Sequence, residues 1–239
     1  MRWSQAIVKR LAAVLIAGSV AGQALGADAA ELELLLDRQD GSIELYAAAR
    51  ADTLLDAFGL PHARLTNDQG FVHFADLREG TFDIGDELIA RTGATLDGAK
   101  IPFEALSLMV HPIALALPIT TPLEALIAVG VCSVDDPATP PGLADLQGYV
   151  GFIAYVENTA GAITLDLPET GLGPVDVTIR EFRDGTEIGR HEMAVGSDGV
   201  IRIPAEKRRV PLFAWILVGL GGTLVGRRLV QQNRQPGRG

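Results

Sequence analysis

The sequence predicts a mainly β protein: one or two antiparallel, β-sandwich-like exported domains with few short helices, followed by one C-terminal transmembrane helix. Three observations predict this class. Asp-Gly steps separate apolar runs, apolar and polar residues alternate within those runs, and charge-free apolar segments lie near both ends of the 239-residue chain. An Asp-Gly step between apolar runs is a strong hairpin signal, because both residues tolerate the positive φ of tight turns. Strands are therefore expected to dominate the body of the chain.

Asp-Gly steps mark three expected hairpins and the start of a further strand. They lie at Asp40-Gly41, Asp97-Gly98, Asp184-Gly185 and Asp198-Gly199. Residues 175–180 alternate apolar and polar side chains, with the period of two that a half-buried strand needs. Residues 148–204 are accordingly expected to hold about five strands, including a hairpin that residues 158–161 close.

Few helices are expected, and all of them are short. Asp52 or Thr53 is suited to cap a helix over residues 53–58, which the glycine and proline that follow then end. Thr121 begins a capping-box pattern with proline at the first helical position. The β-branched residues over 125–134 are equally typical of a buried strand, so this segment is predicted as either helix or strand.

The body of the chain is expected to divide into two subdomains. Residues 27–134 form a β-rich exported subdomain with short helices, residues 135–143 a linker, and residues 144–206 a small β-sandwich-like subdomain close to the membrane. The linker holds three prolines and two acidic residues, which interrupt the apolar pattern as a domain boundary does.

Residues 105–123 resemble a membrane span in composition, because they contain no Asp, Glu, Lys or Arg. Three prolines, Pro112, Pro118 and Pro122, argue against a span. Each removes a backbone donor that hydrocarbon cannot replace, and together they would break a single helix. This stretch is therefore predicted to be buried strand and extended chain in the domain core.

Residues 1–26 have the pattern of a secretory signal peptide. Basic residues precede the charge-free residues 11–27, which are apolar and rich in small side chains. Small residues at positions 24 and 26 favour cleavage after Gly26, with cleavage after Ala29 or an uncleaved anchor as the alternatives. The pattern predicts that the body of the chain is exported.

Residues 210–226 are predicted to be a transmembrane helix. They contain no charge, and at about 1.5 Å per residue they span about 25 Å, which is short but adequate for a bilayer. Pro211 suits the first helical turn, and Trp215 lies near the depth at which an interfacial indole settles. A smooth flank that permits close approach of another helix is formed by Gly219, Gly222 and Gly226.

Basic residues follow this helix. Arg227 and Arg228 open a basic tail over residues 227–239, so the positive-inside rule places the tail in the cytoplasm. The signal peptide requires the same orientation. The sequence therefore predicts a single-pass protein of the bacterial inner (plasma) membrane, with residues 210–226 in the bilayer and the bulk of the chain periplasmic or otherwise extracytoplasmic.

The C-terminal arrangement resembles a known class of processing signal. Val210-Pro211-Leu212, an apolar helix and then arginines are similar to the C-terminal sorting signals that bacterial exosortase-type enzymes recognise, particularly those with a Val-Pro-Leu-Pro-Ala motif. Phe213 stands where that motif has its second proline, and a tail of 11 residues follows Arg228. An ordinary stop-transfer anchor is the prediction, and removal of the helix by processing is the alternative that the resemblance implies.

Charge is distributed unevenly along the chain. Residues 28–206 carry all 30 acidic residues but only 10 of the 20 basic ones, so this span has a net charge of −20. Such a body disfavours nucleic acid as a partner and is repelled by anionic membrane surfaces. Solubility explains the charge, and a basic partner or divalent cations are the alternatives.

The residues that carry catalytic or metal chemistry show no diagnostic spacing. The four histidines are His62, His73, His111 and His191. They lack metal-ligand spacing, and the sequence has no nucleophile elbow, Walker loop, C-x-x-C or haem-attachment motif. Asp83 and Asp86 cluster with Glu87, but among so many carboxylates close pairs arise by chance. Neither a cofactor nor a metal is expected.

These features favour a non-enzymatic, membrane-anchored envelope protein that binds or scaffolds a partner protein. The partner is expected to contact either the β-rich domain or the glycine-flanked helix. An anchored hydrolase or carbohydrate-active enzyme, with Asp83 and Asp86 as candidate carboxylates, is the alternative from another class. A surface protein processed by an exosortase-type enzyme is the third hypothesis.

Overall fold

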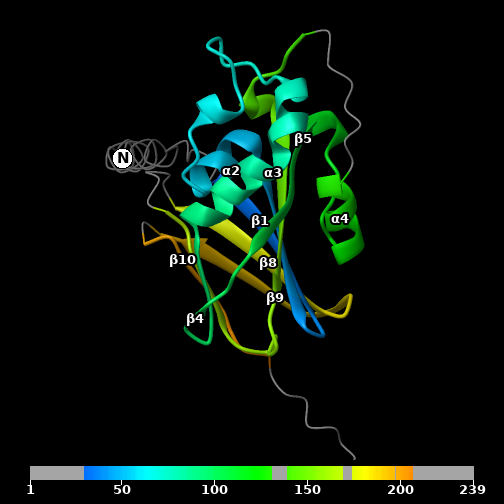
Figure 1. Ribbon diagram of the computed structural model, residues 1–239, viewed down its shortest axis with the longest axis vertical. Helices are drawn as coiled ribbons and strands as arrows, with labels where there is room; N and C mark the ends of the chain where they lie inside the picture. Colours follow the sequence, from blue (N-terminus) through cyan, green and yellow to red (C-terminus); the bar gives the residue numbers. More distant parts are fainter. Residues whose placement is uncertain (1–29, 131–138, 169–173, 197, 207–239) are drawn as a thin grey trace, which may run out of the picture. The chain divides into compact units, whose positions relative to one another are not determined.

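The larger of two sheets has six strands. They are β1 (Ala30–Gln39), β2 (Ser42–Arg50), β5 (Glu104–Pro112), β6 (Leu146–Tyr155), β8 (Val175–Arg183) and β9 (Thr186–Val195). The computed structural model describes residues 30–130, 139–168, 174–196 and 198–206, and the strand order is β5-β6-β2-β1-β8-β9 (Figure 1). Neighbouring strands are antiparallel except β1 and β8, which are parallel. The antiparallel prediction is wrong for that pair, because a long excursion rather than a hairpin connects β1 to β8.

The smaller sheet has four strands. They are β3 (Gly93–Leu96), β4 (Ala99–Lys100), β7 (Ile163–Asp166) and β10 (Val200–Ile203). Their order is β10-β7-β3-β4, and all neighbouring pairs are antiparallel. The prediction of a mainly β protein with few helices is confirmed, and its strands form two sheets.

The three hairpins marked by Asp-Gly steps are confirmed. Residues 40–41, 97–98 and 184–185 join β1 to β2, β3 to β4 and β8 to β9. In the second and third turns both central residues have positive φ, at 50° and 83° for Asp97 and Gly98 and at 49° and 74° for Asp184 and Gly185. This left-handed backbone matches the twist of the flanking strands and explains why glycine occupies the second position.

Three α-helices complete the described fold together with short 3-10 turns. They are α2 (Ala51–Ala57), α3 (Phe74–Arg91) and α4 (Pro122–Gly130); the 3-10 turns are η1 (His62–Arg64), η2 (Ile113–Leu115) and η3 (Leu143–Asp145). The helix predicted over 53–58 is confirmed as α2, but it begins at Ala51, so its N-cap is Arg50 and the predicted cap at Asp52 or Thr53 is wrong. Of residues 125–134, predicted as either helix or strand, residues 125–130 are helical as part of α4, in agreement with the capping pattern at Thr121, and residues 131–134 lie outside the described residues.

Helix α3 departs from the prediction of short helices only, because it is 18 residues long. Its buried residues recur with the helical period, at Phe74, Leu77, Thr81, Ile84 and Leu88. Two glycines lie within the helix, and glycine weakens a helical pattern in a sequence. Packing of the buried stripe against the sheet stabilises the helix despite these glycines.

The main core lies on one face of the large sheet. Leu32, Leu34 and Leu36 of β1 point into it, as do alternate residues of β2, β6 and β8. The same cluster takes in residues of α2, α3 and the small sheet, which together cover this face. A second, smaller cluster lies on the opposite face, where α4 covers Leu35 and Tyr46. The large sheet is thus covered on both faces over part of its width.

The two predicted subdomains share these sheets, so the division at residues 135–143 is corrected. Strand β6 lies between β2 and β5, β8 lies beside β1, and β7 pairs with β3. The described residues up to Pro204 form one compact unit. The strands before residue 135 find their partners after residue 143, and neither set completes a sheet alone. The prediction of about five strands over 148–204 is confirmed by β6 to β10.

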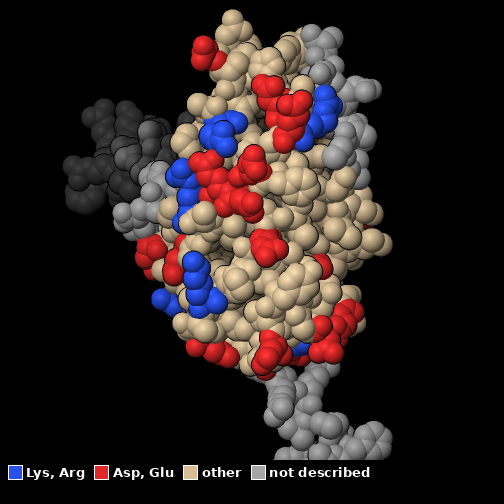
Figure 2. All heavy atoms as spheres, in the orientation of Figure 1, with Lys and Arg blue, Asp and Glu red and all other residues tan. Residues whose placement is uncertain are grey.

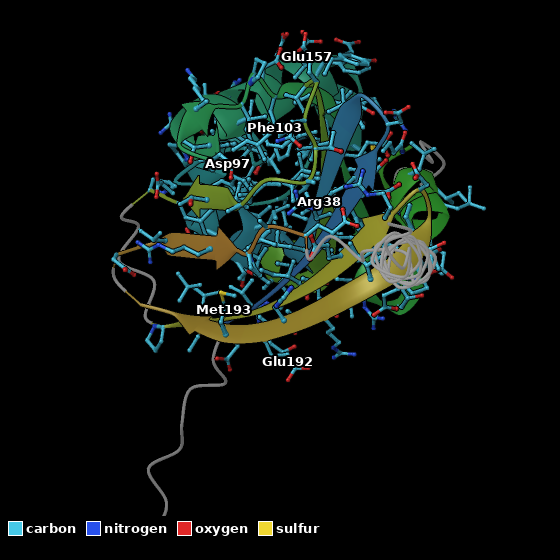
Figure 3. The ribbon with its side chains drawn as sticks, turned by 90° about the horizontal axis from the view of Figure 1, so that it is seen from below. Arg38, Asp97, Phe103, Glu157, Glu192 and Met193 are labelled. Atoms are coloured by element: carbon cyan, nitrogen blue, oxygen red, sulfur yellow. The ribbon has the colours of Figure 1, made fainter. Side chains whose placement is uncertain are left out.

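A buried arginine joins the two sheets. Arg38 on β1 is fully buried, and it lies between the sheets in Figure 3. Its Nε donates to Oε1 of Glu181 at 2.6 Å, and its Nη1 donates to the carbonyl oxygens of Thr159 and Gly161. The hairpin predicted at 158–161 is wrong, because this segment crosses from β6 in the large sheet to β7 in the small one.

Residues 105–123 are only partly buried. Strand β5 is confirmed, and its residues 108–111 are buried. The chain then leaves the core at Pro112, and Ile113 and Leu115 are exposed, which contradicts the prediction for that part of the stretch. Among the described residues, none of the helices has the length and apolar character that crossing a membrane demands. The predicted signal peptide at 1–26, the anchor at 210–226 and the tail at 227–239 lie outside the described residues.

Candidate interaction surface

Of the residues singled out in the sequence as membrane anchor or candidate carboxylates, the structure describes only the carboxylates Asp83 and Asp86. The predicted membrane-anchor residues lie outside the described residues; they are Pro211, Trp215, Gly219, Gly222, Gly226, Arg227 and Arg228. Asp83 and Asp86 are exposed on α3. Asp86 accepts a hydrogen bond from the backbone N–H of Ala105 at 3.2 Å, so it serves to attach α3 to β5. This contact gives the carboxylate a structural role.

The four histidines lie in four separate environments. His62 contacts Asp56 at 2.9 Å, and His73 contacts Asn67 at 3.1 Å. His111 is buried against the carbonyl oxygen of Ala128, and His191 lies 3.4 Å from Oε2 of Glu181. In the described ranges no group of three or more His, Cys, Asp or Glu side chains is arranged to hold a metal ion.

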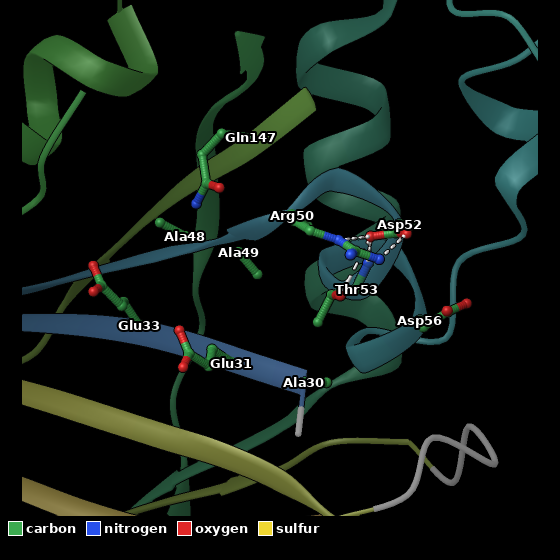
Figure 4. Close-up of a pocket in the computed structure, with 10 residues that line it drawn as sticks. All are labelled: Ala30, Glu31, Glu33, Ala48, Ala49, Arg50, Asp52, Thr53, Asp56 and Gln147. Carbon is green, nitrogen blue, oxygen red and sulfur yellow. Dashed lines mark hydrogen bonds and ion pairs between the residues drawn. The ribbon is translucent and has the colours of Figure 1, made fainter. Parts of the chain in front are cut away.

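A hollow of about 640 Å³ opens at the end of β1 and β2 (Figure 4). Its one cationic lining side chain, Arg50, is already paired with Asp52, at 3.1 Å from Nε to Oδ1 and 2.6 Å from Nη2 to Oδ2. Partial burial raises the pKa of Asp52, but bonds from Arg50 and Thr53 outweigh burial and hold that pKa below its usual value. The other charged lining residues are carboxylates. The Thr53 hydroxyl donates to Asp52 Oδ1 at 3.3 Å, but this carboxylate is already engaged by the Arg50 guanidinium.

The most distinctive feature of the described surface is apolar. Eight large hydrophobic side chains are exposed, and five of them lie between residues 113 and 127. They are Ile113, Leu115, Leu123, Leu126 and Ile127, with exposed fractions of 48, 64, 66, 49 and 44%. We refer to these five side chains, on η2 and α4, as the α4 surface. Single exposed hydrophobics scattered over a surface are ordinary, whereas large contiguous exposed apolar patches mark interaction sites.

Helix α4 is apolar on both sides. Ala125, Ala128 and Val129 are buried in the cluster on the outer face of the large sheet, while Leu126 and Ile127 face away from it and are exposed. A helix that covers a sheet needs only one apolar face, and a helix that is apolar all round is normally buried. The second apolar face of α4 therefore has no function in the fold of the described residues.

Hydrogen bonds fix the start of α4. Oγ1 of Thr121 accepts from the backbone N–H of Glu124 at 3.3 Å, and Glu124 Oε2 accepts from the backbone N–H of Thr120 at 3.1 Å. The Thr120 hydroxyl also donates to Glu124 Oε2. This bond is the largest of the causes that hold the pKa of the Glu124 carboxyl below its usual value. The capping box thus determines where the helix begins.

Two buried side chains fix the position of the surface on the sheet. The hydroxyl of Tyr149, on β6, donates to the carbonyl oxygen of Leu117 and accepts from its N–H, both at 2.8 Å. Burial raises the pKa of this tyrosine. His111 packs edge-on against Tyr149, with ring centroids 5.3 Å apart, and contacts the Ala128 carbonyl oxygen at 3.1 Å. These contacts therefore fix the α4 surface in position on the large sheet.

The α4 surface lies in a region of low charge. Between Glu104 and Asp135 the only charged residue is Glu124, although the body of the chain is strongly acidic. In Figure 2 carboxylates gather over α2 and α3, and the surface over α4 is largely without charged side chains. Charged residues are depleted at the centre of protein–protein interfaces. The position and composition of this surface therefore suit an interface core.

Comparison with known proteins adds no functional information: the chain matches neither a protein-family model nor a curated protein. The sequence interpretation missed the α4 surface, because an uncharged run is typical of a buried segment. A signal was present in the sequence. Over residues 123–129 apolar side chains occupy every side of the helix except that of Glu124, which is more than packing on a single sheet requires.

Proposed function

We propose that this chain is a membrane-anchored envelope protein whose β-rich domain is a non-enzymatic module, and that it binds a partner protein through the α4 surface. The observation that carries the proposal is the concentration of five of the eight exposed large hydrophobics on η2 and α4. An exposed apolar area of this kind, held on a fixed support, is typical of surfaces that bind another molecule.

A protein is a better occupant of the α4 surface than a lipid bilayer. The span 28–206 has a net charge of −20, so anionic lipid headgroups repel it. An apolar patch on an uncharged surround matches the core of a protein interface. The expected partner is an envelope protein with a complementary apolar patch and few charges near it.

The location rests on the sequence at both ends of the chain. The signal-peptide pattern of residues 1–26 supports export, and the charge-free residues 210–226 support a single transmembrane helix. The arginines over 227–239 support a cytoplasmic tail. In this arrangement the β-rich domain faces the periplasm, where its partner is also located.

The proposal is tested by co-purification from native membranes in mild detergent. The α4 surface is changed in a Leu126→Ser/Ile127→Ser variant, and Phe82→Ser on α3, a residue 59% exposed, is the matched control for loss of an exposed hydrophobic. The wild-type chain and the control are expected to retain a stoichiometric partner, which the α4 variant loses. Repeated isolation of the wild-type chain alone, or retention of the same partner by all three, contradicts the proposal.

A further inference from the structure

Strand β9 is an edge strand of the large sheet. It is ten residues long, and among the described strands it is hydrogen-bonded to β8 alone. Within the described part of the chain, the backbone N–H and C=O groups on its other side therefore have no partner strand. Such an edge is a template for pairing with another strand.

The opposite edge of the same sheet is closed. Helix α3 lies along β5, where Thr81 Oγ1 accepts from the N–H of Leu108 at 3.0 Å and Asp86 Oδ1 accepts from the N–H of Ala105 at 3.2 Å. At Gly85 the helix approaches so closely that an added Cβ would lie 2.8 Å from the Cβ of Ala105. None of the described elements covers β9 in this way, as Figures 1 and 3 show.

The side chains of β9 alternate between two faces. Arg190, Glu192 and Ala194 are exposed, whereas Met193 is partly buried against the main core. Figure 3 shows Glu192 pointing away from the molecule and Met193 pointing towards the small sheet. Arg190 and Glu192 therefore share the outer face, where their side chains are 2.9 Å apart.

We propose that β9 pairs antiparallel with β9 of a second copy of this chain, about a two-fold axis at His191, so that two six-stranded sheets become one. A two-fold axis perpendicular to the sheet keeps the same face of both copies on the same side. Each residue is then opposite a residue whose number differs by an even amount. In the register centred on His191, Arg190 of each copy is opposite Glu192 of the other.

Charge selects this register over its neighbours. Centring the axis on Arg190 places two arginines opposite each other, and centring it on Glu192 places two glutamates opposite each other. Like charges directly opposite in a sheet are unfavourable, whereas opposite charges are favourable. The register centred on His191 forms two Arg190–Glu192 pairs between copies, in addition to the pair within each strand.

The same charges disfavour indiscriminate pairing of the open edge. Charged side chains on edge strands guard against unwanted pairing. A partner strand that lacks an alternating positive and negative pair gains no charge pair across the new interface, and one that places a like charge opposite Arg190 or Glu192 is disfavoured. The edge thus rejects general partners and accepts a second copy, which supplies both charges in the required order.

The test measures the mass of the full chain in detergent by sedimentation equilibrium over a range of concentrations. The wild-type chain is expected to dimerise. Arg190→Glu places like charges opposite in two pairs and is expected to weaken the dimer about tenfold or more. The double variant Arg190→Glu/Glu192→Arg restores both pairs and the dimer. The matched control is Arg202→Glu, the same charge change on an exposed residue of β10, which leaves dimerisation unchanged.

A cross-linking experiment tests the register itself. The chain's single cysteine is first removed by Cys132→Ser. In this background a short bismaleimide reagent is expected to link copies of His191→Cys, because the two introduced cysteines are opposite each other at the axis. It does not link copies of Ala194→Cys, whose cysteines lie about 20 Å apart at 3.4 Å per residue. The proposal is overturned by a monomer at all concentrations, by a dimer that Arg190→Glu leaves intact or that Leu126→Ser/Ile127→Ser dissolves, or by cross-linking that favours position 194.

Discussion

Helices α3 and α4 both pack on the large sheet, but the side chains on their exposed sides differ in character. On α3 the buried positions form one stripe that includes Leu77 and Leu88, and carboxylates such as Asp83 and Asp86 occupy the exposed side. On α4 the exposed side carries Leu123, Leu126 and Ile127. Helix α3 is an ordinary surface helix, which shows that this protein can place charge on the outer side of a helix. The apolar outer side of α4 therefore needs another explanation, and the partner proposed above would be that explanation.

The largest expected difference between the two helices comes from the same substitution made in each. Leu88 on α3 is fully buried, so Leu88→Ala is expected to lower the free energy of unfolding by about 2–5 kcal/mol, through lost burial and the cavity left behind. Leu126 on α4 is 49% exposed, and Leu126→Ala is expected to change the free energy of unfolding by less than about 1 kcal/mol. Urea titration followed by circular dichroism measures both. Equal losses would show that α4 is packed like α3.

The contact of α3 with β5 provides the next test. Gly85→Ala places a Cβ 2.8 Å from the Cβ of Ala105, so the helix must move away from the strand. Overpacking of this kind costs about 1–3 kcal/mol. Gly80→Ala on the same helix meets nothing closer than 3.5 Å and is the matched control, expected to be neutral or stabilising because alanine is the better helix former. Thermal unfolding of the two variants compares them directly, and equal melting temperatures would contradict the close packing.

The support of the α4 surface is tested at Tyr149. Tyr149→Phe removes the hydroxyl that bonds both the N–H and the C=O of Leu117, at an expected cost of about 1–3 kcal/mol. Amide hydrogen exchange is expected to increase over residues 113–121 and to stay unchanged in α3. Unchanged protection over 113–121 would show that the tyrosine does not hold this segment.

Alkaline pH sharpens the same prediction. Burial raises the pKa of Tyr149, and burial followed by a bond to Glu44 raises that of Tyr46, above the value of 10.0 for an exposed tyrosine. The folded state therefore holds both protons more tightly than the unfolded state does. This stability is fully present below pH 10.0 and is lost as the pH rises above it. Tyr149→Phe is expected to make the unfolding free energy less sensitive to pH in that range. If the unfolding free energy of the variant varied with pH as steeply as that of the wild type, a raised pKa of Tyr149 would be contradicted.

Local turn chemistry in the sequence predicted much of the β structure. Asp-Gly steps located three hairpins, because the left-handed backbone of a tight turn requires those residues. The capping pattern at Thr121 marked the start of α4. Alternation in residues 175–180 identified β8, because one of its faces is buried and the other is not.

The arrangement of the strands depends on long-range contacts that no local pattern reveals. The parallel pairing of β1 with β8 and the antiparallel pairing of β2 with β6 join residues more than 90 positions apart. Arg38, which holds segments from three parts of the chain, cannot be distinguished in the sequence from a solvated arginine. The α4 surface was hidden for a related reason, because an apolar side chain looks the same in sequence whether it faces a core or a partner.

The most direct test of the proposed binding site is photo-cross-linking in living cells. A photoreactive benzoylphenylalanine replaces Leu123, which is 66% exposed on α4, and in a matched strain it replaces Phe82, which is 59% exposed on α3. Illumination of intact cells is expected to give one discrete adduct from position 123 and none from position 82. Absence of an adduct at position 123, or the same adduct from both positions, would contradict a partner at the α4 surface.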